Sequence, residues 1–175
     1  NSAKAVKAVG SMGYSFLTAV MRSARSTFQR TPVPRRTASA NAAPDAKSIQ
    51  KERDSLQGTW LPHEARIGGQ DIPAEVLKSL RLTLKGDRYE VSTGKASDKT
   101  SDSGVIMFDP STTPHTMAIK GEAGPNKGKT LLALYELAGD ELKICYDLSG
   151  GKTPAEFASE PATQLLLVKY RRETR

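Results

Sequence analysis

Residues 130–148, TLLALYELAGDELKICYDL, decide the fold of this chain. Two apolar runs flank the turn residues Ala138-Gly139-Asp140. Turn residues between two such runs are typical of a β-hairpin. On either side of this hairpin, further short apolar runs follow one another at a spacing of roughly ten residues, as in all-β barrels and sandwiches. The sequence therefore predicts a mainly β, antiparallel domain.

The other elements follow from the same signals. A short helix is predicted over 45–57, where Pro44-Asp45 provides a helix start. The β region begins at 58–60, and a helical turn at 73–78 interrupts the early strands. The remaining predicted strands are 80–84, 88–91, 104–108, 116–119, 130–137, 141–148 and 164–170.

Charge divides the chain into two parts. Residues 1–50 hold eight Lys or Arg and one acid, whereas residues 51–175 hold 18 basic and 18 acidic residues. We therefore predict a basic arm over residues 1–44 and a neutral β-barrel domain over residues 45–175. Because the folded part carries no basic stripe, nucleic acid is not expected as a partner.

The arm has the pattern of an amphipathic helix followed by a linker. Apolar residues recur at helical spacing within 11–29, and a cationic stripe lies on the opposite face. Pro32, Pro34 and Pro44 mark an extended linker. We predict that the arm binds other protein subunits, and acidic lipid headgroups where these are present, through Tyr14, Leu17, Met21, Arg22, Arg25, Phe28, Arg35 and Arg36.

The β region resembles a family of uncharacterised lipocalin-like domains that is abundant in planctomycete bacteria. The resemblance covers about residues 45–173 and rests on several short motifs. These are Leu56-Gln57-Gly58-Thr59-Trp60, 84–89, 109–114, 124–130, 135–137, 140–145 and 154–157. It departs from the family at 133–134, at Thr153 and in the polar loop 92–103.

The resemblance implies a fold and two kinds of site. The fold is a lipocalin-like antiparallel barrel of about eight strands. Trp60 would close one end of the barrel, with Arg171 or Arg172 of the last strand stacked on the indole. Five aromatic residues would line a cup for a small apolar ligand, or simply fill the interior: Phe108, Tyr135 and Tyr146, together with Tyr89 and Phe157.

The sequence offers no pattern for catalysis or for a resident cofactor. The Gly-rich stretch 121–130 has Ala123 where a phosphate loop needs glycine, and it lies between strands, so it is interpreted as a turn. His63 and His115 are too few for a metal site, and Glu64 should point to the face opposite His63. Cys145 is interpreted as a small apolar filler.

Two functions are therefore expected from different classes. The first is a non-catalytic accessory module, held in a larger assembly by its arm. The alternative is a carrier of a small apolar ligand. The low acid content of the arm is typical of organellar targeting segments, which favours a plastid or mitochondrion, with a bacterial envelope as the alternative.

Overall fold

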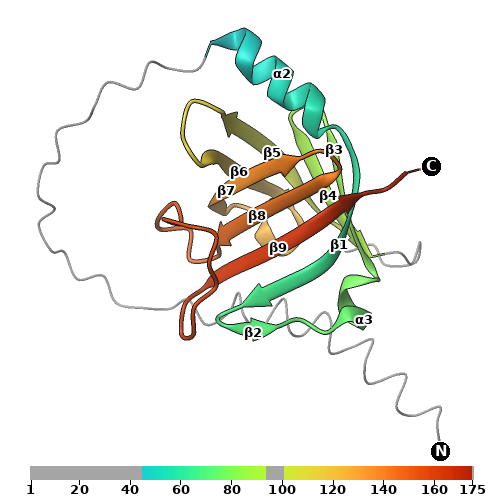
Figure 1. The fold of residues 1–175 in the computed structure, drawn as a ribbon, viewed down its shortest axis with the longest axis vertical. Helices are drawn as coiled ribbons and strands as arrows, with labels where there is room; N and C mark the ends of the chain where they lie inside the picture. Colours follow the sequence, from blue (N-terminus) through green and yellow to red (C-terminus); the bar gives the residue numbers. More distant parts are fainter. Residues whose placement is uncertain (1–44, 94–100, 175) are drawn as a thin grey trace, which may run out of the picture. The chain divides into compact units, whose positions relative to one another are not determined.

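The computed structural model describes residues 45–93 and 101–174. Within them the chain is mainly β, and its strands form an antiparallel sheet that closes on itself (Figure 1). The predicted fold class, a lipocalin-like barrel of eight strands with a short helix before it, is confirmed. Residues 42–175 form one compact unit.

The strands follow one another around the barrel in chain order. They are β1 (Gly58–Ile67), β3 (Leu80–Lys85), β4 (Arg88–Thr93), β5 (Asp102–Asp109), β6 (His115–Ala123), β7 (Thr130–Ala138), β8 (Glu141–Asp147) and β9 (Leu165–Arg172). The short strand β2 (Gln70–Asp71) pairs with β1 alone and was not predicted. Two further short elements are the helix α3 (Ala74–Leu77) and the 3-10 turn η1 (Gly124–Asn126).

Closure occurs between the first and last strands. Trp60 of β1 pairs with Leu82 of β3 on one side and with Arg172 of β9 on the other. Each strand of the barrel therefore has a neighbour on both sides, although some pairings are short: β1 pairs with β3 over Gly58–Trp60, and β5 pairs with β4 over Asp102–Val105. Closure in this way leaves fewer open edges than a flat sheet would.

Helix α2 (Ala46–Leu56) lies across one end of the barrel, here called the helix end (Figure 1). Its start is capped by Asp45, whose carboxylate accepts a hydrogen bond from the Ser48 amide at 2.7 Å. Leu56 is fully buried at its other terminus. The opposite end of the barrel, which holds η1 and the connection between β8 and β9, is called the open end.

Alternating side chains build the core, as the period of a β-strand requires. Along β8, Leu142 and Ile144 face the interior, and along β7, Leu131 and Ala133 do the same. Cys145 is also fully buried, but it lies outside this interior cluster, where its thiol contacts the Ala158 carbonyl at 3.3 Å. The 148–164 connection therefore covers part of the outer surface.

Arg172 connects α2 to the seam of the barrel. Its guanidinium carbon lies 4.2 Å from the centroid of the Trp60 ring. The same guanidinium donates to the Gln57 carbonyl and, at 2.7 Å, to the Ser55 carbonyl, both at the C-terminus of α2. The Trp60 indole N–H in turn donates to the Leu56 carbonyl at 3.0 Å. A cation at this position also offsets the negative end of the helix dipole.

We therefore predict that Arg172→Ala lowers the free energy of unfolding by about 2 kcal/mol or more, because it removes the cation–π contact and the bonds to the helix terminus. Urea unfolding monitored by tryptophan fluorescence measures this loss. The control is Arg171→Ala on the neighbouring exposed residue, which should change the value by less than about 0.5 kcal/mol. Equal effects of the two variants would contradict this role of Arg172.

Candidate functional site

At the helix end, four polar or aromatic side chains from different elements meet. The Glu52 carboxylate of α2 lies 3.5 Å from Nδ1 of His115, the first residue of β6. His115 packs edge-on against Tyr135 of β7, with ring centroids 5.5 Å apart. Phe108 of β5 contacts the other side of Tyr135 at 5.7 Å. This cluster links α2 to the rim of the barrel.

The Tyr135 hydroxyl is buried and no described residue accepts or donates a hydrogen bond to it. Burial is the main cause that raises the pKa of Tyr135 well above its ordinary value, and the nearby negative charge of Glu52 raises it further. The Glu52 carboxylate therefore acts on the Tyr135 hydroxyl through its charge, but it does not lie at hydrogen-bond distance and angle from this hydroxyl. An unsatisfied buried hydroxyl usually costs stability.

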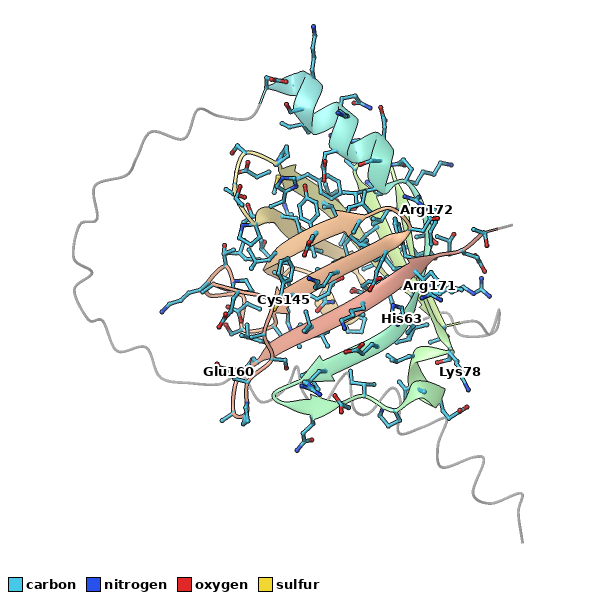
Figure 2. The ribbon with its side chains drawn as sticks, viewed as in Figure 1. His63, Lys78, Cys145, Glu160, Arg171 and Arg172 are labelled. Carbon is cyan, nitrogen blue, oxygen red and sulfur yellow. The ribbon has the colours of Figure 1, made fainter. Side chains whose placement is uncertain are left out.

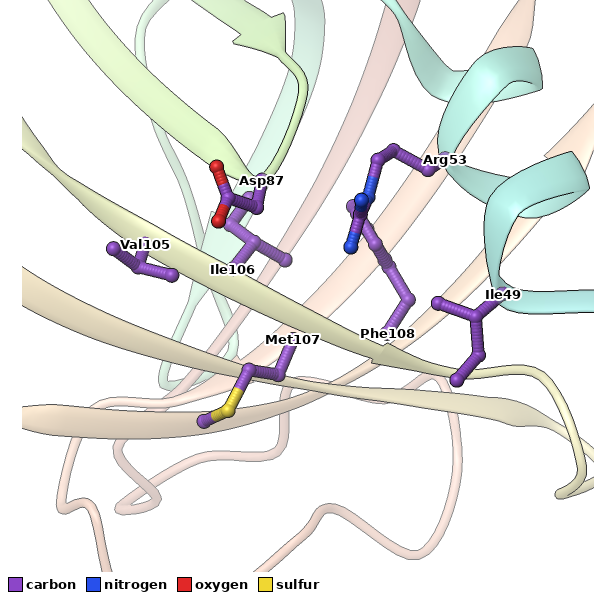
Figure 3. Close-up of a pocket in the computed structure, with 7 residues that line it drawn as sticks. All are labelled: Ile49, Arg53, Asp87, Val105, Ile106, Met107 and Phe108. Carbon is purple, nitrogen blue, oxygen red and sulfur yellow. The ribbon is translucent and has the colours of Figure 1, made fainter. Parts of the chain in front are cut away.

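Beside this cluster lies a hollow of about 220 Å³, here called the α2–β5 hollow (Figure 3). The Arg53 side chain reaches into it from α2, and its buried Nε atom has no hydrogen-bond partner among the described residues. Met107 stands at its outer side with 57% of its surface exposed. The lining residues are Ile49, Arg53, Asp87, Val105, Ile106, Met107 and Phe108.

The hollow borders a stretch where β5 extends beyond β4. The register between these strands ends at Arg88 opposite Val105, and the Ile106 amide donates to the Asp87 carbonyl at 2.7 Å. Beyond Ile106, the β5 residues pair with β6 alone. Within the described residues, one edge of 107–109 therefore has no neighbouring strand, and it lies next to the exposed Met107 and to Arg53.

A second polar group of residues lies inside the barrel, toward the open end. Asp102 and Asn126 are each 8% exposed. The Asn126 side-chain amide donates to Asp102 at 2.5 Å, and its backbone N–H donates to the same carboxyl at 3.2 Å. The Tyr89 hydroxyl donates to Asp102 at 3.4 Å. We call Asp102, Asn126, Tyr89, Tyr146 and Tyr170 the interior polar cluster.

Burial sets the protonation of this cluster. The pKa of Asp102 is raised, chiefly because burial penalises the ionised form, although its hydrogen bonds and the charge of Lys129 oppose the shift. Tyr146 and Tyr170 share a hydrogen bond of 3.2 Å. Burial raises the pKa of Tyr170 to about 12, so the phenol stays protonated near neutrality.

Glycine makes room for the interior polar cluster. Gly121 of β6 faces inward, and a Cβ atom at this position would lie 2.0 Å from the Asn126 carbonyl oxygen. No larger residue fits without moving the η1 turn away. The close approach of η1 to β6 is therefore what brings Asn126 to Asp102. The Gly-rich stretch 121–130 is a turn between strands, as its sequence predicted.

The structure brings together some of the residues that the sequence predicted for the barrel interior, and it separates others. Of the two candidates for stacking on Trp60, Arg172 lies over the indole, and Arg171 is exposed (Figure 2). Of the predicted cup, Phe108 and Tyr135 contact each other, but Tyr146 lies opposite Ala133, one inward position further from the helix end. The arm residues fall outside the described residues: Tyr14, Leu17, Met21, Arg22, Arg25, Phe28, Arg35 and Arg36.

One expectation about the first strand is wrong. His63 and Glu64 were expected on opposite faces, but the register of β1 shifts between Pro62 and Glu64, and both side chains are exposed. A bulge inserts an extra residue and so breaks the alternation. Glu64 pairs with Lys169 at 2.8 Å, and His63 lies 3.9 Å from Glu141.

Tyr89 was expected to line or fill the barrel interior. The site residues that the sequence did not single out are Glu52, Arg53, Asp87, Asp102, Asn126 and Tyr170. Asp102 offered one signal, since it precedes an alternating run in which Gly104, Ile106 and Phe108 are the inward positions. The alternation extends to Asp102 and places a carboxyl inside the barrel. No comparable signal points to Glu52 and Arg53, because a charged helix is usually solvated.

The geometry defines a lipocalin-like β-barrel with a hollow at its helix end and a polar cluster within. No family model matches the chain, and no curated protein matches it.

Among residues 45–93 and 101–174, no group of three or more His, Cys, Asp or Glu side chains is arranged to hold a metal ion. No helix in that part of the chain is long and apolar enough to cross a bilayer.

We predict that Tyr135→Phe leaves the free energy of unfolding unchanged or raises it by up to about 1 kcal/mol, because it removes an unsatisfied buried hydroxyl. Tyr170→Phe, which breaks the bond to Tyr146, should lower it by about 1 kcal/mol. Urea unfolding of both variants makes the comparison. A loss of about 2 kcal/mol for Tyr135→Phe would show that Glu52 accepts a hydrogen bond from this hydroxyl.

A second prediction concerns the dependence of stability on pH. Because the pKa of folded Asp102 lies above its ordinary value of 3.8, the folded protein holds this proton more tightly than the unfolded chain. The contribution of Asp102 is therefore fully present below that value and is lost as pH rises through the folded pKa. The difference in unfolding free energy between the wild type and Asp102→Asn should therefore fall as pH rises above the ordinary pKa of 3.8.

Asp71 supplies a control of opposite sign, because Arg66 lowers the pKa of its carboxyl. The difference in unfolding free energy between the wild type and Asp71→Asn should rise slightly as pH rises toward the ordinary pKa of 3.8. Solvent screening keeps this difference small. Urea unfolding at several pH values tests both. A pH-independent difference for Asp102→Asn would contradict the raised pKa.

Proposed function

We propose that this protein is a non-catalytic interaction module, an accessory subunit whose barrel docks a partner protein at the α2–β5 hollow. The observation that carries the proposal is the buried Arg53 Nε, which has no hydrogen-bond partner in the described part of the chain and lies beside the exposed Met107. A buried donor without a partner costs stability in the free protein, and a partner's acceptor would relieve that cost.

The surroundings of Arg53 indicate the chemistry of the partner. The unpaired edge of β5 offers backbone groups to an extended segment, as in β-strand addition. Ile49, Val105 and Met107 offer apolar surface to a side chain of that segment. A carboxylate next to this side chain would pair with Arg53. The occupant is therefore an extended protein segment with an acidic residue beside an apolar one.

In this proposal the arm makes a second attachment, to other subunits or to the acidic headgroups of an organelle membrane, as its composition predicts. Two weak contacts on one chain raise the overall affinity through their effective concentration. The alternative, a small-ligand carrier, draws support from the interior polar cluster, but the polar groups there fit a ligand that forms hydrogen bonds better than an apolar one.

The test is photocrosslinking of the full chain in cells of its native host, with a benzophenone amino acid at position 107. We expect a discrete crosslinked product, reduced at least about fivefold by Arg53→Ala, since truncating an interface arginine typically costs more than 1 kcal/mol. The matched control places the benzophenone at position 171, which is exposed on β9 across the barrel.

Equal products from positions 107 and 171, or a product at 107 that Arg53→Ala does not weaken, would contradict docking at the hollow. Deletion of residues 1–44 should weaken the product at 107 without abolishing it, because the barrel surface remains. Complete loss on deletion would show that the arm alone holds the partner.

A further inference from the structure

The interior polar cluster contains more hydrogen-bond acceptors than its donors satisfy. Asp102 accepts from Asn126 and from Tyr89. The Tyr146 and Tyr170 hydroxyls bond to each other. The side-chain oxygen of Asn126, a residue that is 92% buried, has no donor among the described residues. This oxygen can therefore accept a hydrogen bond from a donor outside the described residues.

The cluster also holds a carboxyl without a cation. None of the ion pairs found within the described part of the chain involves Asp102. Lys129 acts on Asp102 only through its charge, and burial still raises the pKa of the carboxyl. Buried carboxylates are normally paired with a cation or fully hydrogen-bonded.

The third feature is aromatic. Asp102 contacts Tyr89, and it lies close enough to Tyr146 for its charge to raise the pKa of that phenol. A hydroxyl oxygen can accept a further hydrogen bond through its lone pairs. A carboxyl, an unpaired amide oxygen and tyrosine hydroxyls together are complementary to an ammonium group, which carries positive charge and donates hydrogen bonds.

We propose that the interior polar cluster is the binding site for a small organic primary amine, whose ammonium pairs with Asp102 and donates to the Asn126 side-chain oxygen. This site lies inside the barrel and does not depend on the α2–β5 hollow. The two hydrogen bonds that Asn126 of η1 donates to Asp102 account for the position of the turn. They leave the side-chain oxygen of Asn126 without a donor in the described part of the chain. A purely structural role of Asp102 therefore does not explain the cluster.

The probe is n-butylammonium, titrated into the isotopically labelled full chain while the side-chain amide signals of Asn126 are followed by nuclear magnetic resonance. We expect a saturable shift with a dissociation constant on the order of 1 mM, as suits a ligand of this size. Tetramethylammonium has the charge but no donor, and n-butanol has the chain but no charge. Both should bind at least tenfold more weakly.

Asp102→Asn should weaken butylammonium binding at least tenfold. The matched control is Asp147→Asn. Asp147 is also a buried acid (7% exposed) that stabilises a turn, because it accepts hydrogen bonds from the backbone amides of Ser149 and Lys152, but it makes no hydrogen bond to the interior polar cluster. This variant should bind as the wild type does. The wild-type titration keeps the test valid if Asp102→Asn does not fold.

The absence of a saturable shift at Asn126 in the wild type would overturn the proposal. So would equal affinity for butylammonium and either of the two comparison probes, since the site would then recognise only charge or only apolar surface. A photocrosslink at position 107 tests the other surface, so failure of one experiment leaves the outcome of the other intact.

Discussion

The seam between the first and last strands is the constraint on which the rest of the structure depends. Trp60 pairs across both neighbouring strands there, and Arg172 covers its indole while binding the carbonyls at the end of α2. One arginine thus joins barrel closure to helix docking. The position of α2 then determines where Arg53 and Glu52 lie, and so shapes the helix end.

Side chains pack differently at the two ends of the barrel. At the helix end, α2 covers the interior with Leu56, and its polar side chains lie above the rim. Arg53 and Tyr135 each bury a polar atom there that has no partner among residues 45–93 and 101–174. At the open end, the η1 turn folds over Gly121 and inserts Asn126 beside Asp102. Unsatisfied polar groups are uncommon in native interiors, and here they occur at both ends, where a barrel has fewest strand neighbours.

The two proposals also rest on polar groups of different chemistry, a donor on Arg53 and an acceptor on Asn126. Arg53 needs an acceptor on a surface that includes an exposed methionine and a strand edge, which suits a protein segment. Asn126 needs a donor in an enclosed aromatic setting, which suits a small cation.

The sequence by itself determined the local structure: the hairpin at 138–140, the cap of α2 at Asp45 and the alternation that assigns Ile144 and Phe108 to the interior. These features depend on turn chemistry and strand period, which act over a few residues. Only the tertiary structure decided that Arg172 rather than Arg171 meets Trp60, that Glu52 meets His115, and that Asn126 meets Asp102. Each pair joins residues of different elements, so local sequence does not bring them together. The Arg172–Trp60 pair depends on the register at closure, where a shift of one residue would turn every side chain to the other face.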